Sequence, residues 1–197
     1  MKEAIRQRAL ELGFDDCRFT TAEPPESAEQ FLKWLEGQCH GTMKWMERNA
    51  AKRIDPQLVL EGARSVITLA ASYDSGSGEQ TEPCQGVIAR YSQYADYHDA
   101  LGQALGQLTS QVQSLAGEDA RSLWYVDTGP VLERDLGQRA GLGFIGKHTN
   151  LISRRLGNWF FVSEILTTAE LEPDESERNH CGKCTSCIDA CPTGAIS

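Results

Sequence analysis

Four of the seven cysteines in this 197-residue chain lie close together, within residues 181–191. They are Cys181, Cys184, Cys187 and Cys191, and a proline follows the last one directly. The spacing C-x2-C-x2-C-x3-C-P is the one with which bacterial iron–sulfur proteins bind [4Fe–4S] clusters. Structural zinc is the alternative, but zinc usually takes two separated pairs of ligands. The sequence therefore predicts that these thiols ligate the iron atoms of an iron–sulfur cluster.

The number of thiols raises a difficulty for this prediction. The fourth cysteine of such a run ligates a second cluster in two-cluster proteins, so the first cluster would lack one ligand. Only six residues follow Cys191. We therefore expect the chain to be the N-terminal part of a longer protein, or a shortened chain, which by itself binds cofactor with weak or no turnover.

A second set of residues suited to chemistry follows the apolar run 122–126. Asp127 ends this run, and the Thr-Gly-Pro after it predicts a sharp turn into a helix. Burial at a strand end would favour the protonated carboxyl, so Asp127 could act as a general acid. A plain helix-capping aspartate is the alternative. Arg134 lies seven residues further on, two helical turns along the same face.

A glycine-rich segment precedes a short polar run. Residues 141–150 contain three glycines and end in Lys147, His148, Thr149 and Asn150. Glycines allow a backbone to approach a large ligand, and the polar residues could form hydrogen bonds with it. The spacing differs from that of a phosphate-binding P-loop, so a nucleotide site is not favoured.

Composition and charge narrow the class of protein. The 28 acidic and 19 basic residues give a net charge of −9, which does not favour nucleic-acid binding by bulk electrostatics. Apolar runs are too short to span a membrane, and the charged N-terminus does not resemble a signal peptide. An odd number of cysteines argues against a secreted disulfide scaffold. We expect a cytoplasmic protein without a membrane partner.

Apolar spacing and turn residues predict the elements that must hold these side chains. Helices are expected over residues 1–12, 27–37, 42–46, 101–115 and 131–140, with Ser27 opening a capping box, Thr42 as a cap, and Asp55-Pro56 starting a further turn. Strands are expected over residues 65–71, 87–91 and 122–127, and a β-hairpin over 150–165. Residues 74–83 are predicted to form a loop, and the acidic residues 170–177 a solvated linker. The mixture favours the α+β class.

Four stretches taken together resemble the epoxyqueuosine reductase family: residues 94–98 (YADYH), 127–134 (DTGPVLER), 141–150 (GLGFIGKHTN) and the cysteine run. The resemblance extends roughly from Gly41 to the end. It implies a nitroreductase-like α+β domain that binds cobalamin, beside a ferredoxin-like domain with two [4Fe–4S] clusters. On this basis we expect the cobalamin-binding catalytic domain to span residues 1–169 and the start of the ferredoxin-type domain to span 170–197.

The resemblance also implies roles for single residues. Asp127 would be the proton donor, and His98 and Arg134 would contact the substrate. Contacts with the cofactor are implied for Arg53, Asp127, Lys147, His148, Thr149 and Asn150. A helix cap remains the alternative for His98, and a solvated helix arginine for Arg134.

His148 departs from the family, which usually has asparagine at this position. A histidine there raises the question of a bond to cobalt. The family's cobalamin carries no such ligand, so His148 is expected only to contact the cofactor.

The expected function is the reduction of epoxyqueuosine to queuosine in tRNA. Loss of an epoxide oxygen requires electrons that no side chain supplies, so a cofactor must take part. Electrons would pass from an external donor through the clusters to the cobalt of cobalamin. Two alternatives remain: a reductive dehalogenase-like enzyme with the same cofactors, and a non-enzymatic iron–sulfur electron carrier.

Overall fold

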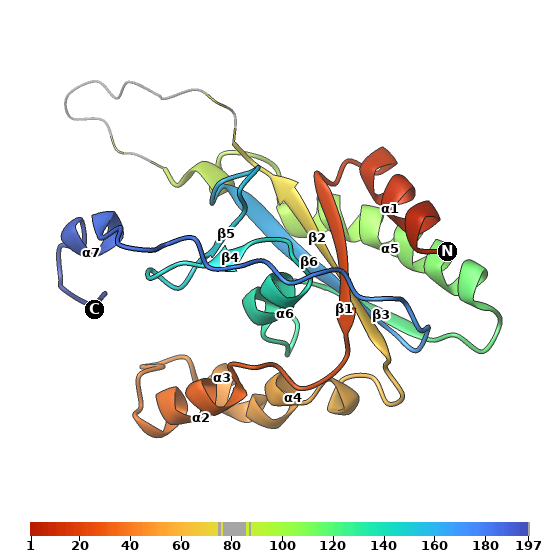
Figure 1. Ribbon diagram of the computed structural model, residues 1–197, viewed down its shortest axis with the longest axis horizontal. Coiled ribbons are helices and arrows are strands. Elements are labelled where there is room, and N and C mark those ends of the chain that lie inside the picture. Colours follow the sequence, from red (N-terminus) through yellow and green to blue (C-terminus); the bar gives the residue numbers. More distant parts are fainter. Residues whose placement is uncertain (75, 77–85, 87, 197) are drawn as a thin grey trace.

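The computed structural model describes residues 1–74, 76, 86 and 88–196 of the chain. Its centre is a four-stranded sheet with the order β1-β2-β6-β3 (Figure 1). These strands are β1 (Asp16–Thr21), β2 (Ser65–Ser72), β6 (Phe160–Thr167) and β3 (Ser122–Val126). Each neighbouring pair is antiparallel, so the mixed α and β architecture expected from the sequence is confirmed.

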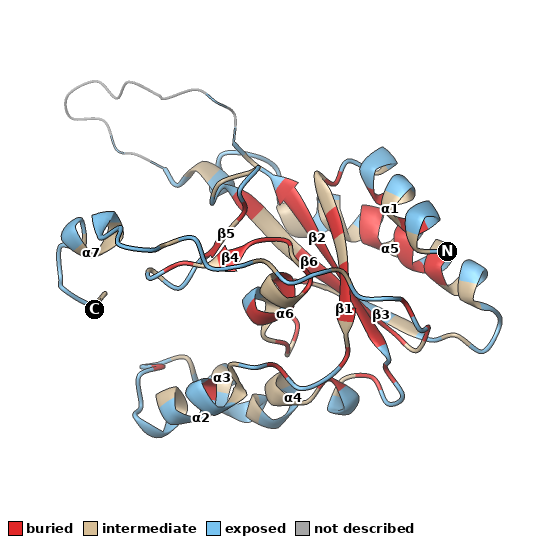
Figure 2. Ribbon diagram, in the orientation of Figure 1, coloured by how far each residue is buried: buried red, intermediate tan, exposed pale blue. Residues whose placement is uncertain are grey.

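One face of the sheet is covered by α1 (Lys2–Glu11) and α5 (Tyr97–Ala116). Ile67 and Ile165 lie opposite each other on β2 and β6, and they pack with Leu105 and Leu108 of α5. The 4-3-4-3 spacing of leucines and valine in α5 places these side chains on one stripe. Figure 2 shows the buried residues gathered on the strands and on the helix faces turned toward them.

The opposite face of the sheet is covered by α6 (Glu133–Arg139) and by a small sheet of β4 (Phe144–Ile145) and β5 (Leu151–Ile152). Leu136 of α6 packs on Val66 and Leu166 of the central strands. The short helices α2 (Ala28–Glu36), α3 (Lys44–Arg48) and α4 (Ala50–Ile54) extend this side of the molecule (Figure 1). No described helix is both long and apolar enough to cross a membrane.

The strongest predictions from sequence are confirmed within about two to four residues at each end. The predicted helices 1–12, 27–37, 101–115 and 131–140 correspond to α1, α2, α5 and α6, and strands 65–71 and 122–127 to β2 and β3. Asp55 caps η1 (Pro56–Leu58), since its carboxylate accepts a hydrogen bond from the amide N–H of Gln57 at 3.0 Å.

Four predictions of local structure are wrong. Ser27 makes no side-chain capping bond, and Met43, not Thr42, stands at the start of α3. Residues 90–92 form the 3-10 turn η2 (Arg90–Ser92) instead of a strand. The hairpin over 150–165 does not form, because β5 pairs with β4 whereas β6 pairs with β2 and β3. Val87 and most of the predicted loop 74–83 lie outside the described residues.

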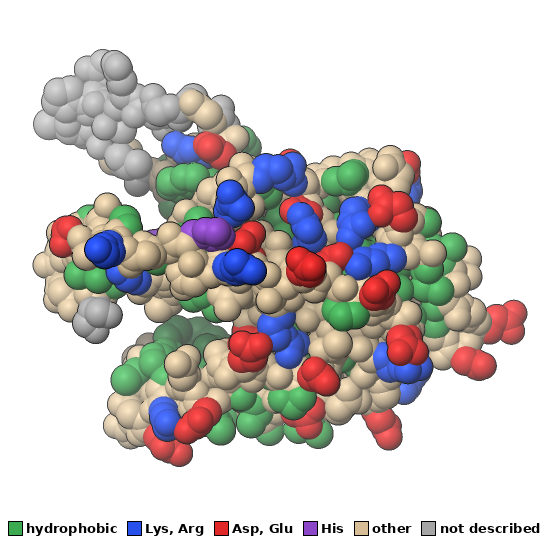
Figure 3. Space-filling view, in the orientation of Figure 1, with side chains coloured by type: hydrophobic (Ala, Val, Ile, Leu, Met, Phe, Trp, Pro, Cys, Tyr) green, Lys and Arg blue, Asp and Glu red, His purple; other side chains and the backbone are tan. Residues whose placement is uncertain are grey.

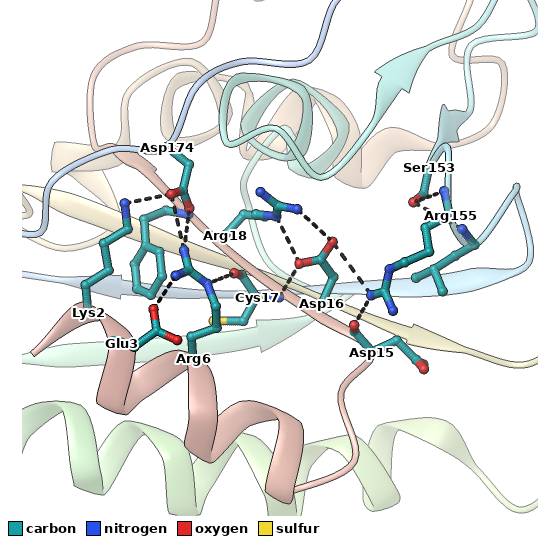
Figure 4. Close-up of polar contacts among 12 residues, drawn as sticks. Lys2, Glu3, Arg6, Asp15, Asp16, Cys17, Arg18, Ser153, Arg155 and Asp174 are labelled. Atoms are coloured by element: carbon teal, nitrogen blue, oxygen red, sulfur yellow. Dashed lines mark hydrogen bonds and ion pairs between the residues drawn. The ribbon is translucent and has the colours of Figure 1, made fainter.

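The acidic segment 170–177 is more than a solvated linker. It runs along the edge strand β1, where Phe19 and Asp174 exchange two hydrogen bonds. The Asp174 carboxylate also forms ion pairs with Lys2 at 2.6 Å and with Arg6 at 3.1 Å (Figure 4). Leu171 is buried beside the sheet. Charge spacing alone could not show this docking, because the partners lie more than 150 residues away in sequence.

Candidate active site

A cavity of about 400 Å³ opens where β3 ends and α6 begins, and the first residues of β5 and β6 also line it. Its volume lies within the range of small-molecule sites, roughly 300–1,000 Å³. Aromatic rings make up much of the wall, and a few polar groups converge on it. The lining residues used below are Tyr97, Asp127, Glu133, Arg134, Asn150 and Asn158.

Asp127 lies on the wall of this cavity in an unusual backbone conformation. Its φ is +58°, in the left-handed region that aspartate and asparagine tolerate better than most residues. The hydroxyl of Tyr97 donates a hydrogen bond of 2.9 Å to its Oδ2. The burial expected for Asp127 is not found: its side chain is exposed toward the cavity because the turn after Val126 leaves the sheet.

Tyr97 is fixed by stacking. Its ring lies 4.0 Å, between centroids, from that of Phe161, with an angle of 11° between the planes. Burial, followed by the hydrogen bond with Asp127, raises the pKa of Tyr97. Its hydroxyl therefore stays protonated at neutral pH and remains a donor to Asp127.

Glu133 is a functional candidate that was not predicted from the sequence. It is the first residue of α6, lines the cavity, and has one carboxyl oxygen, Oε1, that is buried without a partner among the described residues. Burial and the nearby charge of Asp127 raise the pKa of Glu133 to about 8. Its position inside the motif DTGPVLER, between Asp127 and Arg134, was the available signal.

Arg53 holds the loop that follows Asp127 (residues 128–132) through hydrogen bonds to its backbone. Its Nη1 donates to the backbone carbonyls of Gly129 at 3.3 Å and Val131 at 3.1 Å. Burial lowers the pKa of Arg53, and the charge of Glu133 opposes that change. Arg53 is outside the described lining of the cavity, so it bears on the site through the loop that it holds.

Arg134 and the loop 146–150 are joined directly. Nη1 of Arg134 donates to the carbonyl of Thr149 at 3.1 Å, and Asn150 lines the cavity. On the other side of the loop, the ammonium of Lys147 donates to the carbonyls of Gly182 at 3.1 Å and Cys184 at 2.9 Å. The loop therefore lies between the cavity and the cysteine segment.

The two histidines make local contacts. Nδ1 of His148 accepts from the amide N–H of Asn150 at 3.1 Å, and its Nε2 lies 2.8 Å from Nδ2 of Asn158. Both ring nitrogens are engaged, which leaves none free for a metal. His98 pairs with Asp96, which caps α5, and its ring stacks on Tyr97 at 4.1 Å between centroids.

Two glycines of the segment 141–150 are needed for contacts within the protein rather than with a ligand. A Cβ at Gly141 would lie 2.2 Å from the carbonyl oxygen of Glu175, and Gly141 has φ +80°. A Cβ at Gly143 would lie 2.5 Å from the carbonyl oxygen of Ile152. The glycines therefore allow the acidic segment and β5 to approach closely.

The four clustered cysteines lie at the far end of the chain, around α7 (Ser186–Asp189). Hydrogen bonds with Thr193 lower the pKa of Cys191 to about 7, and those with Ser186 lower the pKa of Cys184. Over the described part of the chain, no three Cys, His, Asp or Glu side chains converge as a metal site. Cysteine thiols suit the iron atoms of an iron–sulfur cluster. The four side chains are, however, not arranged around one cluster here.

Comparison with solved structures defines a class of fold shared by two kinds of enzyme. Epoxyqueuosine reductase from Streptococcus thermophilus has a TM-score of 0.90 at 32% identity, covering 100% of this chain and 54% of that one. The reductive dehalogenase NpRdhA in complex with 3-bromo-4-hydroxybenzoic acid has a TM-score of 0.67 at 15% identity, covering 99% of this chain and 25% of that one. The second likeness concerns the fold alone.

Sequence comparison separates the two kinds. The family model described as "Epoxyqueuosine reductase QueG, DUF1730" matches residues 53–128. Epoxyqueuosine reductase from Gloeobacter violaceus is 42% identical over 194 residues, covering 98% of this chain and 60% of that protein. The Escherichia coli enzyme is 35% identical, covering 100% of this chain and 52% of that protein. The chain is thus a relative of the epoxyqueuosine reductases, of whose length it spans somewhat more than half.

Proposed function

We propose that this chain carries the active site of an epoxyqueuosine reductase, which converts the epoxide of epoxyqueuosine in tRNA to the alkene of queuosine. The observation that carries the proposal is Asp127, presented to a cavity by the segment DTGPVLER in a chain related throughout to such enzymes. A Bacillus subtilis relative is described with its aspartate catalytic loop swung out of the active site. Another relative was solved with an epoxyqueuosine-modified tRNA stem loop.

The chemistry asks for two protons as well as two electrons. Reducing an epoxide to an alkene consumes both pairs and releases the oxygen as water. Cobalamin, when bound, would supply the reducing electrons at its cobalt. Asp127 would give a proton to the departing oxygen, and the hydroxyl of Tyr97 at 2.9 Å would hold the carboxyl in place.

Residues at the mouth of the cavity fit a corrinoid in their chemistry. The side-chain amides of Asn150 and Asn158 line the cavity and suit the amide groups at the edge of a corrin. The loop that holds Lys147, His148 and Thr149 would lie along the cofactor, and Arg53 would act by fixing the Asp127 loop. The cavity is smaller than a whole corrinoid, which would extend beyond it.

Substrate contacts would come from Arg134, which is exposed beside the cavity, and from His98. Positive and negative side chains are interspersed over the face in Figure 3, and the net charge is −9. Phosphate binding depends on lysine and arginine. We therefore propose that this chain contacts the modified nucleoside and makes fewer contacts with the phosphates of the RNA backbone.

The remaining parts of the proposal concern the electrons. Cys181, Cys184, Cys187 and Cys191 would ligate [4Fe–4S] clusters, with an external donor supplying electrons in the cytoplasm. Residues 1–169 would form the nitroreductase-like cobalamin domain and 170–197 the start of a ferredoxin-like domain. The loop 146–150 supports electron transfer from the cysteine segment to the cavity, because it joins the two through Lys147.

The test is anaerobic turnover. The chain is incubated with cobalamin, a low-potential reductant and an epoxyqueuosine-modified stem loop, and the nucleoside is analysed by mass spectrometry. We expect the nucleoside to lose one oxygen atom. Cobalamin binding without this loss, together with halide release from a brominated phenol, would instead support the dehalogenase alternative.

A further inference from the structure

A second cavity, of about 440 Å³, adjoins the candidate active site. It opens between the end of β2 and the start of α5, and its wall contains five aromatic side chains. Four of them, Tyr73, Tyr91, Tyr97 and Phe161, also line the first cavity, whereas Tyr94 lines only the second. The two cavities therefore meet along a shared group of rings, and a ligand that fills the first can continue into the second.

The shared rings are fixed against one another. The ring of Phe161 lies 4.0 Å from that of Tyr97 and 4.6 Å from that of Tyr73, between centroids. Tyr73 meets Trp159 edge-on at 6.0 Å, and the guanidinium of Arg90 lies 4.6 Å from the centroid of the Trp159 ring. Rings held in this way form a preorganised apolar surface, so a planar ligand would not have to order them on binding.

Two tyrosines remain exposed beside these rings. Tyr91 is 49% exposed and Tyr94 is 57% exposed. Tyr94 is the first residue of the motif YADYH and precedes the start of α5 at Tyr97 by three residues. Proteins that bind single-stranded RNA offer aromatic side chains on which bases stack. Tyr94 therefore has the chemistry of a stacking platform, at the edge of a cavity next to the active site.

The charge of the second cavity disfavours a phosphate as its ligand. Among the described lining residues, Asp74 is the only one that carries a charge, and its carboxylate is paired with Arg90. A phosphate there would meet a carboxylate and would lack the lysine or arginine contacts on which phosphate binding depends. The lining favours a neutral planar group instead.

We propose that the second cavity binds the base of a nucleotide next to the modified nucleoside of the stem loop. This inference rests on the proposed function. Neighbouring nucleosides of an RNA strand are joined by a single phosphodiester, so when the modified nucleoside occupies the first cavity its neighbour lies within reach of the second. Stacking needs no cation, which reconciles RNA binding with a net charge of −9. It also accepts any base, because every base has a π-face.

A double-mutant cycle on RNA binding tests the proposal. Binding of the cobalamin-loaded chain to a fluorescent epoxyqueuosine-modified stem loop is measured by anisotropy, without reductant. We expect Tyr94→Ala to weaken binding by about 5- to 100-fold, the range for loss of one stacked base, and Tyr94→Phe to bind like wild type. In two further stem loops, an abasic site replaces the base on one side or the other of the modified nucleoside. With one of these, Tyr94→Ala should cause no further loss. Equal losses on the intact and on both abasic stem loops would overturn the proposal.

Further variants separate stacking from other roles of Tyr94. Ala100→Leu, in the first turn of α5, should also weaken binding, because the larger side chain fills the second cavity. Trp45→Ala is the matched control and should bind like wild type, since Trp45 is 51% exposed on α3 and lines neither cavity. The salt dependence of binding should keep its slope in Tyr94→Ala, because a ring releases no counterions. A smaller slope would show a phosphate contact and contradict stacking.

Cobalamin carries a heterocyclic base of its own, so cobalamin binding is measured on the same variants by absorption titration. Tyr94→Ala should bind cobalamin like wild type. Weaker cobalamin binding with an unchanged affinity for the stem loop would overturn the proposal in favour of the base of the cofactor. The binding cycle needs no epoxide reduction, so the two proposals fail separately. Turnover without coupling between Tyr94 and a base refutes the base site alone. Coupling in a chain that does not reduce epoxyqueuosine refutes the proposed function and keeps the base site.

Discussion

Asp127 combines an uncommon backbone conformation with an exposed carboxyl. The left-handed φ of Asp127 turns its side chain out of the sheet and toward the cavity. Few residues other than glycine accept this conformation readily, and asparagine is one of them. Asparagine also keeps an oxygen that can accept the hydrogen bond of Tyr97. Asp127→Asn therefore removes the acid and preserves the shape of the loop.

Glu133 should make the stability of the protein depend on pH. Its pKa is raised from 4.5 to about 8 in the folded chain, so the folded state holds the proton more tightly than the unfolded state. The free energy of unfolding should then decrease as pH rises from about 4.5 to about 8, with a slope of at most about 1.4 kcal/mol per pH unit for this group. Glu164, which is fully buried on β6, contributes in the same direction because burial also raises its pKa.

Urea denaturation at several pH values measures this dependence. Glu133→Gln should flatten the decrease, whereas Glu118→Gln, at an exposed position, should leave it unchanged. Equal slopes for wild type and Glu133→Gln would mean that the carboxyl is charged in the folded protein.

At the residue scale, the sequence indicated residues that line the cavity but not the acid that is buried in the sheet. Asp127 and Arg134 could be selected because turn residues and a family motif surround them. Glu164 could not, since the sequence FFVSEILT does not show which face of the sheet the strand turns toward α6. The register of β6 against both β2 and β3 buries it, and register depends on distant partners.

The acidic segment 170–177 acts as a clasp on the edge of the sheet, held through Asp174 as shown in Figure 4. The side chain of Asp174 is 15% exposed and accepts from Lys2, Arg6 and the amide N–H of Phe19. Asp174→Asn would turn an amide group toward the two cations. We expect a loss of about 1.5–3 kcal/mol in the free energy of unfolding, as for hydrogen bonds to charged groups.

Thermal or urea unfolding checks this expectation. Glu172→Gln is the matched control, because Glu172 lies two residues away, is exposed, and forms no ion pair among the described residues. If Asp174→Asn and Glu172→Gln unfold alike, the clasp contributes nothing to stability.

Elements with strong internal periodicity could be predicted, and those fixed by distant partners could not. The helix α5 follows from its own leucine spacing. The strand β1 has the mixed sequence DCRFTT and exists because β2 pairs with it along its whole length. The predicted hairpin is wrong for the same reason: β6 finds two partners remote in sequence.

On the scale of the whole molecule, the sheet separates a packed side from a side that bears chemistry. The α1 and α5 side is a continuous apolar core and the α6 side holds Glu164 and Glu133, whereas the cavity is lined from both sides, by Tyr97 of α5 and Glu133 of α6. The loop 146–150 then links the cavity to the cysteine segment.

The paired comparison of wild type with Asp127→Asn tests the central claim most directly. Cobalamin binding is followed by its absorption spectrum, and reduction of the epoxyqueuosine stem loop is followed by mass spectrometry, both without oxygen. We predict that Asp127→Asn binds cobalamin like wild type and loses turnover by about 100-fold or more, in the range for a missing general acid. The control Asp119→Asn, at an exposed turn before β3, should match wild type in both measurements. Full turnover by Asp127→Asn would contradict the account.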